Sequence, residues 1–72
     1  MDIFEIEEKQ ELRREEAAAR LRAIADMLSR ENEVRFEREG MTITAHVADV
    51  VQMKVELEIE SDERELEIEL RW

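Results

Sequence analysis

The most constraining feature of this chain is an uninterrupted alternation of charged and apolar side chains over residues 65–72, which ends on the only tryptophan, Trp72. Residues 53–60 show the same alternation. Neighbouring side chains of a β-strand point to opposite faces, so a period of two places the apolar groups on one face and the charges on the other. Two such segments in tandem predict a β-hairpin with one apolar and one strongly acidic face.

The connection between these two segments sets the expected pairing of their side chains. Residues 61–64 lack the Asn-Gly or Asp-Gly pair of a tight two-residue turn, so we expect a four-residue loop there. A loop of this length sets a register in which Ile59 lies opposite Leu66 and, at the other end of the hairpin, Met53 lies opposite Trp72. On the acidic face it sets glutamates opposite each other, an arrangement that destabilises a strand pair. The pairs are Glu58 with Glu67 and Glu56 with Glu69.

The segment from about Arg13 to Arg30 has the apolar spacing of an α-helix. Its apolar stripe recurs at intervals of four, three and four residues, and consists of Ala17, Leu21, Ile24 and Leu28. Asn32 is expected to end the helix. Arg13 offers no side-chain oxygen to cap the helix start, so we expect this end to be poorly capped.

Three further segments alternate in the manner of β-strands: residues 3–9, 33–39 and 41–47. Gly40 is the only glycine and separates the last two, where a turn needs a positive φ. A second turn is expected at residues 48–49. After it, the alternation breaks at the two consecutive valines Val50 and Val51, so we expect one of them either to face solvent or to sit at a β-bulge.

These elements predict a single α+β domain over residues 1–72, in the order β-α-β-β-β-β. A single amphipathic helix is expected to cover one face of a mainly antiparallel five-stranded sheet, because neither element can bury its apolar side alone. The last four strands form a meander. The first strand lies at an edge, either parallel to the second or antiparallel to the fifth. The predicted core comprises Leu21, Ile24, Leu28, Phe36, Ile43, Val55, Leu57, Ile68 and Leu70.

The overall charge excludes several classes of partner. The chain carries 21 acidic and 11 basic residues, for a net charge of −10. Such a balance disfavours nucleic acids and anionic membrane surfaces, both of which attract basic proteins. No apolar run approaches the ~18 residues of a membrane-spanning helix, and the first residues are acidic where a signal peptide is basic. The cytoplasm is therefore the expected compartment. Acidic, lysine-poor composition is also compatible with a protein that works in high salt, and solubility alone is the alternative explanation.

The pattern resembles the amphi-Trp domain, a family of small acidic proteins common in halophilic archaea and present in some bacteria. The resemblance is carried by the amphipathic strand over residues 65–72 with its terminal Trp72, by the helix over residues 15–26, and by the spacing between them. Two positions depart from the expected pattern: Arg13 replaces a capping Ser or Thr, and Glu63 replaces a turn glycine. The resemblance implies the fold and no activity.

The chemistry-bearing residues do not assemble into a catalytic set. The chain has no cysteine and a single histidine, His46, which is expected to be a solvated surface residue on the outer face of its strand. Trp72 is expected in the core or at its rim. We therefore predict no catalytic, metal-binding or cofactor-binding residue, and no enzyme activity. The candidate partner-facing surface is the acidic strip of Glu56, Glu58, Glu67 and Glu69.

The predicted function is that of a non-catalytic structural or protein-interaction module. An open sheet leaves strand edges with unpaired backbone groups, so we expect a homodimer formed through a strand edge. The alternative is an acidic binding module that captures or regulates a basic protein, or a weak cation-binding surface. Strong salt dependence of a pull-down partner distinguishes the acidic module from the structural one.

The net charge of −10 leads to a prediction about salt. At ~1 M salt the Debye length falls to ~3 Å, which removes most of the repulsion between glutamates on the acidic face. We expect the melting temperature to rise with sodium chloride up to this concentration, as followed by circular dichroism. A flat or falling curve would mean that the glutamates are already neutralised within the folded protein.

Overall fold

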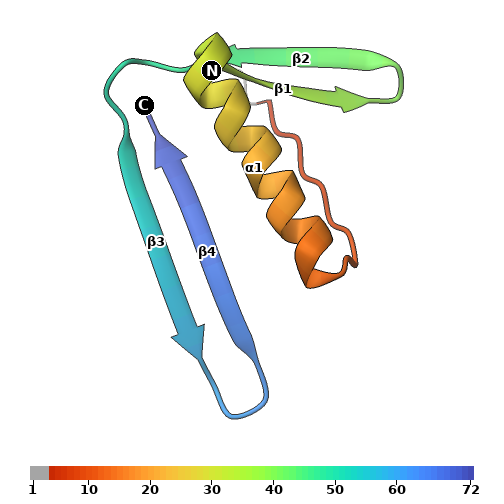
Figure 1. Ribbon diagram of the computed structural model, residues 1–72, viewed down its shortest axis with the longest axis vertical. Coiled ribbons are helices and arrows are strands. Elements are labelled where there is room, and N and C mark those ends of the chain that lie inside the picture. Colours follow the sequence, from red (N-terminus) through yellow and green to blue (C-terminus); the bar gives the residue numbers. More distant parts are fainter. Residues whose placement is uncertain (1–3) are drawn as a thin grey trace.

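A computed structural model describes residues 4–72 and contains one helix followed by four strands (Figure 1). The α+β class is therefore confirmed, but the described residues hold four strands rather than five. The elements are α1 (Arg14–Glu31), β1 (Glu33–Arg38), β2 (Met41–His46), β3 (Gln52–Ile59) and β4 (Arg64–Arg71).

The strands form two separate antiparallel hairpins, β1–β2 and β3–β4, instead of one sheet. The prediction of a single five-stranded sheet is thus wrong. Residues 4–13 form no strand, and neither of the two edges considered for them is occupied, while Ile3 lies outside the described residues. Alternation fixes which side chains share a face, but it leaves open which strand edges pair. Figure 1 shows the two hairpins pointing in different directions from the C-terminal end of α1.

Both ends of α1 follow from local chemistry. Asn32 adopts the left-handed conformation expected of a helix end, with φ 57° and ψ 30°. At the start, the guanidinium of Arg13 has no acceptor atom and cannot cap the first turn. The Glu16 carboxylate instead accepts a hydrogen bond from the Arg13 backbone N–H at 3.1 Å. The side chain that caps the helix start therefore comes from inside the helix.

The β1–β2 hairpin has the turn that its single glycine predicts. Glu39 and Gly40 both have positive φ, 51° and 76°, which is the signature of a type I′ turn. The strands pair Phe36 with Ile43 and Val34 with Ala45, so their apolar side chains share one face. The expected role of Gly40 is confirmed.

The β3–β4 hairpin has the predicted faces but a different register. Leu57 pairs with Leu66 and Val55 with Ile68, a shift of two residues from the predicted pairs. The loop spans residues 60–63, one position earlier than expected, and the Glu60 N–H donates to the Glu63 carbonyl at 2.8 Å. Because side chains repeat every two residues, a shift of two changes every partner and leaves every face as it was.

The predicted single core does not form within one chain. Among the described residues only Val47 is buried, with 7% of its surface exposed. Several predicted core residues are largely exposed: Leu21, Val55, Leu57 and Ile68. The others are half-buried: Ile24, Leu28, Phe36, Ile43 and Leu70. The helix covers part of the first hairpin and leaves most of the β3–β4 apolar side chains in water.

Two global measures agree with this open arrangement. The radius of gyration is 14.2 Å, against about 11 Å for a compact domain of this length. The accessible surface is 7013 Å², against about 4,700 Å² for a compact monomer of this mass. The chain therefore exposes about 2,300 Å² more than an ordinary folded monomer of its size.

The helix and the two hairpins are joined at one place, which we call the junction and which comprises Asn32, His46, Val47 and Trp72. The Val47 N–H donates to the Asn32 carbonyl at 2.9 Å, which ties the end of β2 to the helix end. The Trp72 indole N–H donates to the His46 carbonyl at 2.8 Å, which ties the end of β4 to the end of β2. Trp72 itself remains 54% exposed, so it lies at a rim rather than in a core.

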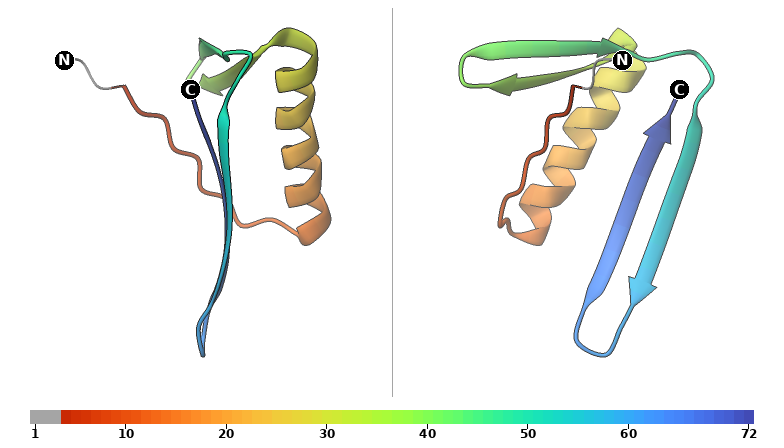
Figure 2. Two further views of the ribbon diagram at one scale, coloured as in Figure 1. Left: turned by 90° about the vertical axis from the view of Figure 1, so that its left-hand side faces the viewer. Right: turned by 180° about the vertical axis from the view of Figure 1, so that it is seen from behind.

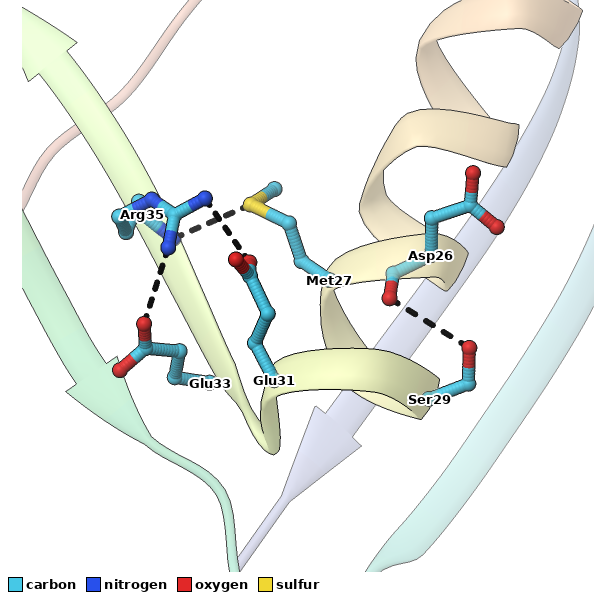
Figure 3. A network of polar contacts seen from close by, with 6 residues as sticks. All are labelled: Asp26, Met27, Ser29, Glu31, Glu33 and Arg35. Carbon is cyan, nitrogen blue, oxygen red and sulfur yellow. Dashed lines mark hydrogen bonds and ion pairs between the residues drawn. The ribbon is translucent and has the colours of Figure 1, made fainter.

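A polar network fastens β1 to the last turns of α1 (Figure 3). The Arg35 guanidinium lies 2.8 Å from the Glu31 carboxylate and 3.0 Å from that of Glu33. The Arg35 backbone N–H donates to the Met27 sulfur at 3.4 Å. The hydrogen bond to Glu31, followed by the charges of both carboxylates, raises the pKa of Arg35 above its ordinary value.

A second contact fixes the segment before the helix. Arg20 forms an ion pair with Glu8 at 3.1 Å, and its guanidinium lies 5.5 Å from the centre of the Phe36 ring. The cation–π geometry favours this position of the side chain. Residues 4–13 thus lie close to the helix and the first hairpin without joining a sheet.

Val47 and Val50 offer a matched pair of substitutions that tests the junction. Val47→Ala removes apolar contacts at the only buried side chain of the described residues, so we expect a loss of about 2 kcal/mol of unfolding free energy. Val50 is 84% exposed, and Val50→Ala should stay within about 0.5 kcal/mol of the parent. Urea unfolding followed by Trp72 fluorescence, at one protein concentration, measures both. Equal losses would contradict the importance of the junction.

Candidate functional site

The β3–β4 hairpin is the most distinctive surface of the structure. Figure 2 shows the hairpin edge-on, with α1 on one side of it and the loop end extending beyond the helix. Its two faces differ completely in chemistry, as the sequence alternation predicts. We consider each face in turn as a candidate site.

The first face, which we call the apolar face, exposes large side chains from both strands. Leu57 is 66% exposed and its cross-strand partner Leu66 is 61% exposed. Exposure decreases along β4 from Leu66 through Ile68 at 44% to Leu70, which is half-buried. The complete apolar face consists of Met53, Val55, Leu57, Ile59, Leu66, Ile68 and Leu70.

The helix covers only the junction end of this face. Leu70 lines a cavity of about 450 Å³ together with Leu28 of α1 and with Val47 and Val51. The apolar face is therefore turned toward the side on which the helix lies. Toward the loop end, residues 8–11 and Leu66 line a wide cavity of about 870 Å³. Leu57, Ile59 and Leu66 each expose more than half of their surface.

The second face, which we call the acidic face, carries the four glutamates predicted as a partner-facing surface. The structure places Glu56, Glu58, Glu67 and Glu69 together on this face. Their pairing differs from the prediction because of the two-residue shift in register. Glu56 lies opposite Glu67, Glu58 lies opposite Glu65, and Glu69 lies opposite Lys54.

The acidic face is neutralised at its junction end and not at its loop end. Lys54 lies 3.3 Å from the Glu56 carboxylate, and the Arg71 guanidinium lies 2.6 Å from that of Glu69. At the loop end, a small cavity of about 80 Å³ is lined by acidic side chains alone: Glu58, Glu60, Glu63 and Glu65. The predicted strip left Glu65 out because it took only two glutamate pairs, whereas the observed register pairs Glu65 with Glu58. Because residues 60–63 contain no glycine to mark the turn, the sequence did not indicate that the loop begins at residue 60 rather than at residue 61.

The described residues offer little for other chemistry. Within residues 4–72, no group of three or more His, Cys, Asp or Glu side chains is arranged to hold a metal ion. His46 is exposed, as predicted, and its backbone carbonyl rather than its ring forms the contact with Trp72. In the same part of the chain, no helix combines the length and the apolar character needed to cross a membrane.

The uncovered apolar face is the feature that the sequence analysis missed. The alternation indicates an apolar face but not its covering, and we expected α1 to cover it. One signal was available: the apolar stripe of a single helix is narrow beside the apolar surface that five strands would present.

The sequence was compared with models of protein families, with curated proteins and with solved structures. The family model of the Amphi-Trp domain matches residues 1–72, the whole length of the chain. No curated protein and no solved structure matches the sequence significantly.

The observed register of the acidic face can be tested by two substitutions of equal charge change. Glu67→Lys places a base opposite Glu56, so we expect a stabilisation of about 0.2–1 kcal/mol. Glu69→Lys places a base opposite Lys54 and removes the ion pair with Arg71, so we expect a destabilisation of similar size. Thermal unfolding of both variants in low salt measures the difference. A stabilisation by Glu69→Lys as large as that by Glu67→Lys would contradict the register.

Proposed function

The chain belongs to the Amphi-Trp domain family, and from this premise we propose that it acts as a non-catalytic structural and interaction module whose working form is a homodimer. The observation that carries this proposal is the amount of apolar surface left in water. A chain whose described part buries a single side chain lacks the core that normally holds a domain of this size together.

The excess surface supports an interface of the obligate kind. Each chain exposes about 2,300 Å² beyond the expected value, and obligate homodimers bury roughly 2,000–5,000 Å² in total. Two copies that covered the apolar side chains of each other would approach the surface of ordinary compact proteins. Small domains without cysteines commonly reach stability in this way, through oligomerisation.

The charge of the chain gives this homodimer a characteristic salt dependence. Two copies that each carry a net charge of −10 repel one another, and salt screens this repulsion while it strengthens apolar association. Association should therefore tighten as salt rises. Capture of a basic protein by the acidic face, the second candidate function, should weaken as salt rises.

The second candidate rests on the loop end of the acidic face. There Glu58 lies opposite Glu65, and among residues 4–72 no lysine or arginine lies within ion-pairing distance of either. A basic partner would relieve this repulsion. Capture of a basic protein is the second candidate because it does not explain the much larger exposed apolar surface.

Light scattering over a concentration series, at low and at high salt, tests the proposed homodimer. We expect a species of twice the 8.6 kDa chain mass, which dissociates on dilution at a lower concentration in high salt than in low salt. Leu57→Glu should shift the equilibrium to the monomer, because it places a charge on the apolar face. Glu58→Gln is the control on the neighbouring position and should leave the dimer intact.

A single 8.6 kDa species at every concentration and salt level would overturn the homodimer. Dissociation promoted by salt would contradict the apolar basis of the association.

A further inference from the structure

We propose that two copies associate by packing the apolar face of one β3–β4 hairpin directly on the apolar face of the other. This inference rests on the proposed homodimer and names its contact surface. It differs from a dimer formed through strand edges, which the sequence alone suggested. The occupant of the apolar face is thus a second copy of the same chain.

The first argument is the position of the free surface. On β4 the exposure is highest at Leu66 and decreases toward Leu70, because the helix covers only the junction end. On β3, from Met53 to Ile59, every apolar side chain is at least 60% exposed. The uncovered part is therefore one continuous strip that includes the loop end, which extends past α1 in Figure 2. Residues 8–11 line a wide cavity of about 870 Å³ together with Glu65 and Leu66, and the strip is open to another sheet from there to the loop end.

The second argument is the symmetry that this position allows. The first hairpin lies at the junction end of the β3–β4 hairpin, and α1 runs alongside it from that end and stops short of the loop. In the proposed dimer a two-fold axis runs perpendicular to the strands near Leu57 and Leu66. The loop ends of the two hairpins then overlap, and the first hairpins of the two copies lie at opposite ends of the dimer. Such a contact uses the same surface on both copies and closes on itself. Two packed sheets then lie about 10 Å apart with their side chains interdigitated.

The third argument is charge. Face-to-face packing turns the two acidic faces outward, so the glutamates of the two copies lie on opposite sides of a two-layer sandwich. At moderate salt this separation is at least about a Debye length. Edge-to-edge pairing would instead join the two acidic faces into one continuous row. Arg64, which lies opposite Ile59 at the loop end of the apolar face, falls at the rim of the face-to-face contact, where its charge stays in water.

The amount of surface is adequate for such a contact. The largest apolar patch of a typical monomer covers roughly 300–600 Å² and often serves as an interaction site. Here seven large side chains form one patch, and six of them are at least 44% exposed. Packing on a second copy of the same face would remove most of this surface from water at once, as in a β-sandwich whose two layers come from two chains.

The experiment uses the absence of cysteine from the chain to place single thiols. Leu57→Cys lies near the expected two-fold axis on the apolar face, and Glu58→Cys is its neighbour on the acidic face. Each variant is treated with a short bis-maleimide at a concentration where light scattering finds the dimer. We expect Leu57→Cys to give the covalent dimer in about tenfold higher yield than Glu58→Cys, because only its thiol lies between the two chains.

Two readouts separate this inference from the homodimer itself. If light scattering finds a dimer but Glu58→Cys links as efficiently as Leu57→Cys, face-to-face packing is wrong and the homodimer stands. If light scattering finds only monomer and neither variant links, the homodimer fails as well. A monomer in which Leu57→Glu causes unfolding would show that α1 closes over the face in solution.

A second pair of positions protects the test against misfolding of one variant. Circular dichroism first checks that each variant retains the parent spectrum. If Leu57→Cys does not, Leu66→Cys on the opposite strand takes its place, with Glu65→Cys as its neighbour on the acidic face. The same tenfold contrast is expected, and equal yields would again overturn the inference.

Discussion

The hydration of one sheet face governs the rest of this structure. The strict two-residue period of β3 and β4 collects seven large apolar side chains on one side of a two-stranded sheet. An isolated two-stranded hairpin is marginally stable in water and needs packing against another layer. Here α1 reaches only the junction end of that face, through Leu28 and Leu70. The remaining surface favours association, and the acidic face opposite favours solubility.

The junction explains how such an open chain keeps a defined shape. Two backbone-directed hydrogen bonds, from Val47 to Asn32 and from Trp72 to His46, join the helix and both hairpins at a single point. The contacts of Arg35 with Glu31 and Glu33 add a second link between α1 and β1. The β3–β4 hairpin is therefore held at one end and free at the other. This arrangement suits a hairpin whose free end packs against another molecule.

The comparison of sequence and structure separates local from long-range information. Features decided by neighbouring residues were predicted: the helix and its end at Asn32, the turn at Gly40, and the two faces of the last hairpin. The register of β3–β4 was wrong by two residues because residues 60–64 contain no glycine or asparagine to mark the turn. The single five-stranded sheet was wrong because alternation carries no information about which edges meet. Glu65 was left out of the predicted acidic strip because that strip was built from two expected glutamate pairs, although the alternation already places Glu65 on the acidic face.

The central claim is that the apolar face is buried between two copies in solution. Methyl NMR with a soluble paramagnetic probe measures this directly, residue by residue. At concentrations that favour the dimer, the methyl groups of Leu57 and Leu66 should be protected from the probe and should become accessible on dilution. The methyl groups of Val50, which is 84% exposed, should remain accessible throughout and serve as the internal reference. Equal accessibility of Leu57, Leu66 and Val50 at every concentration would contradict the account.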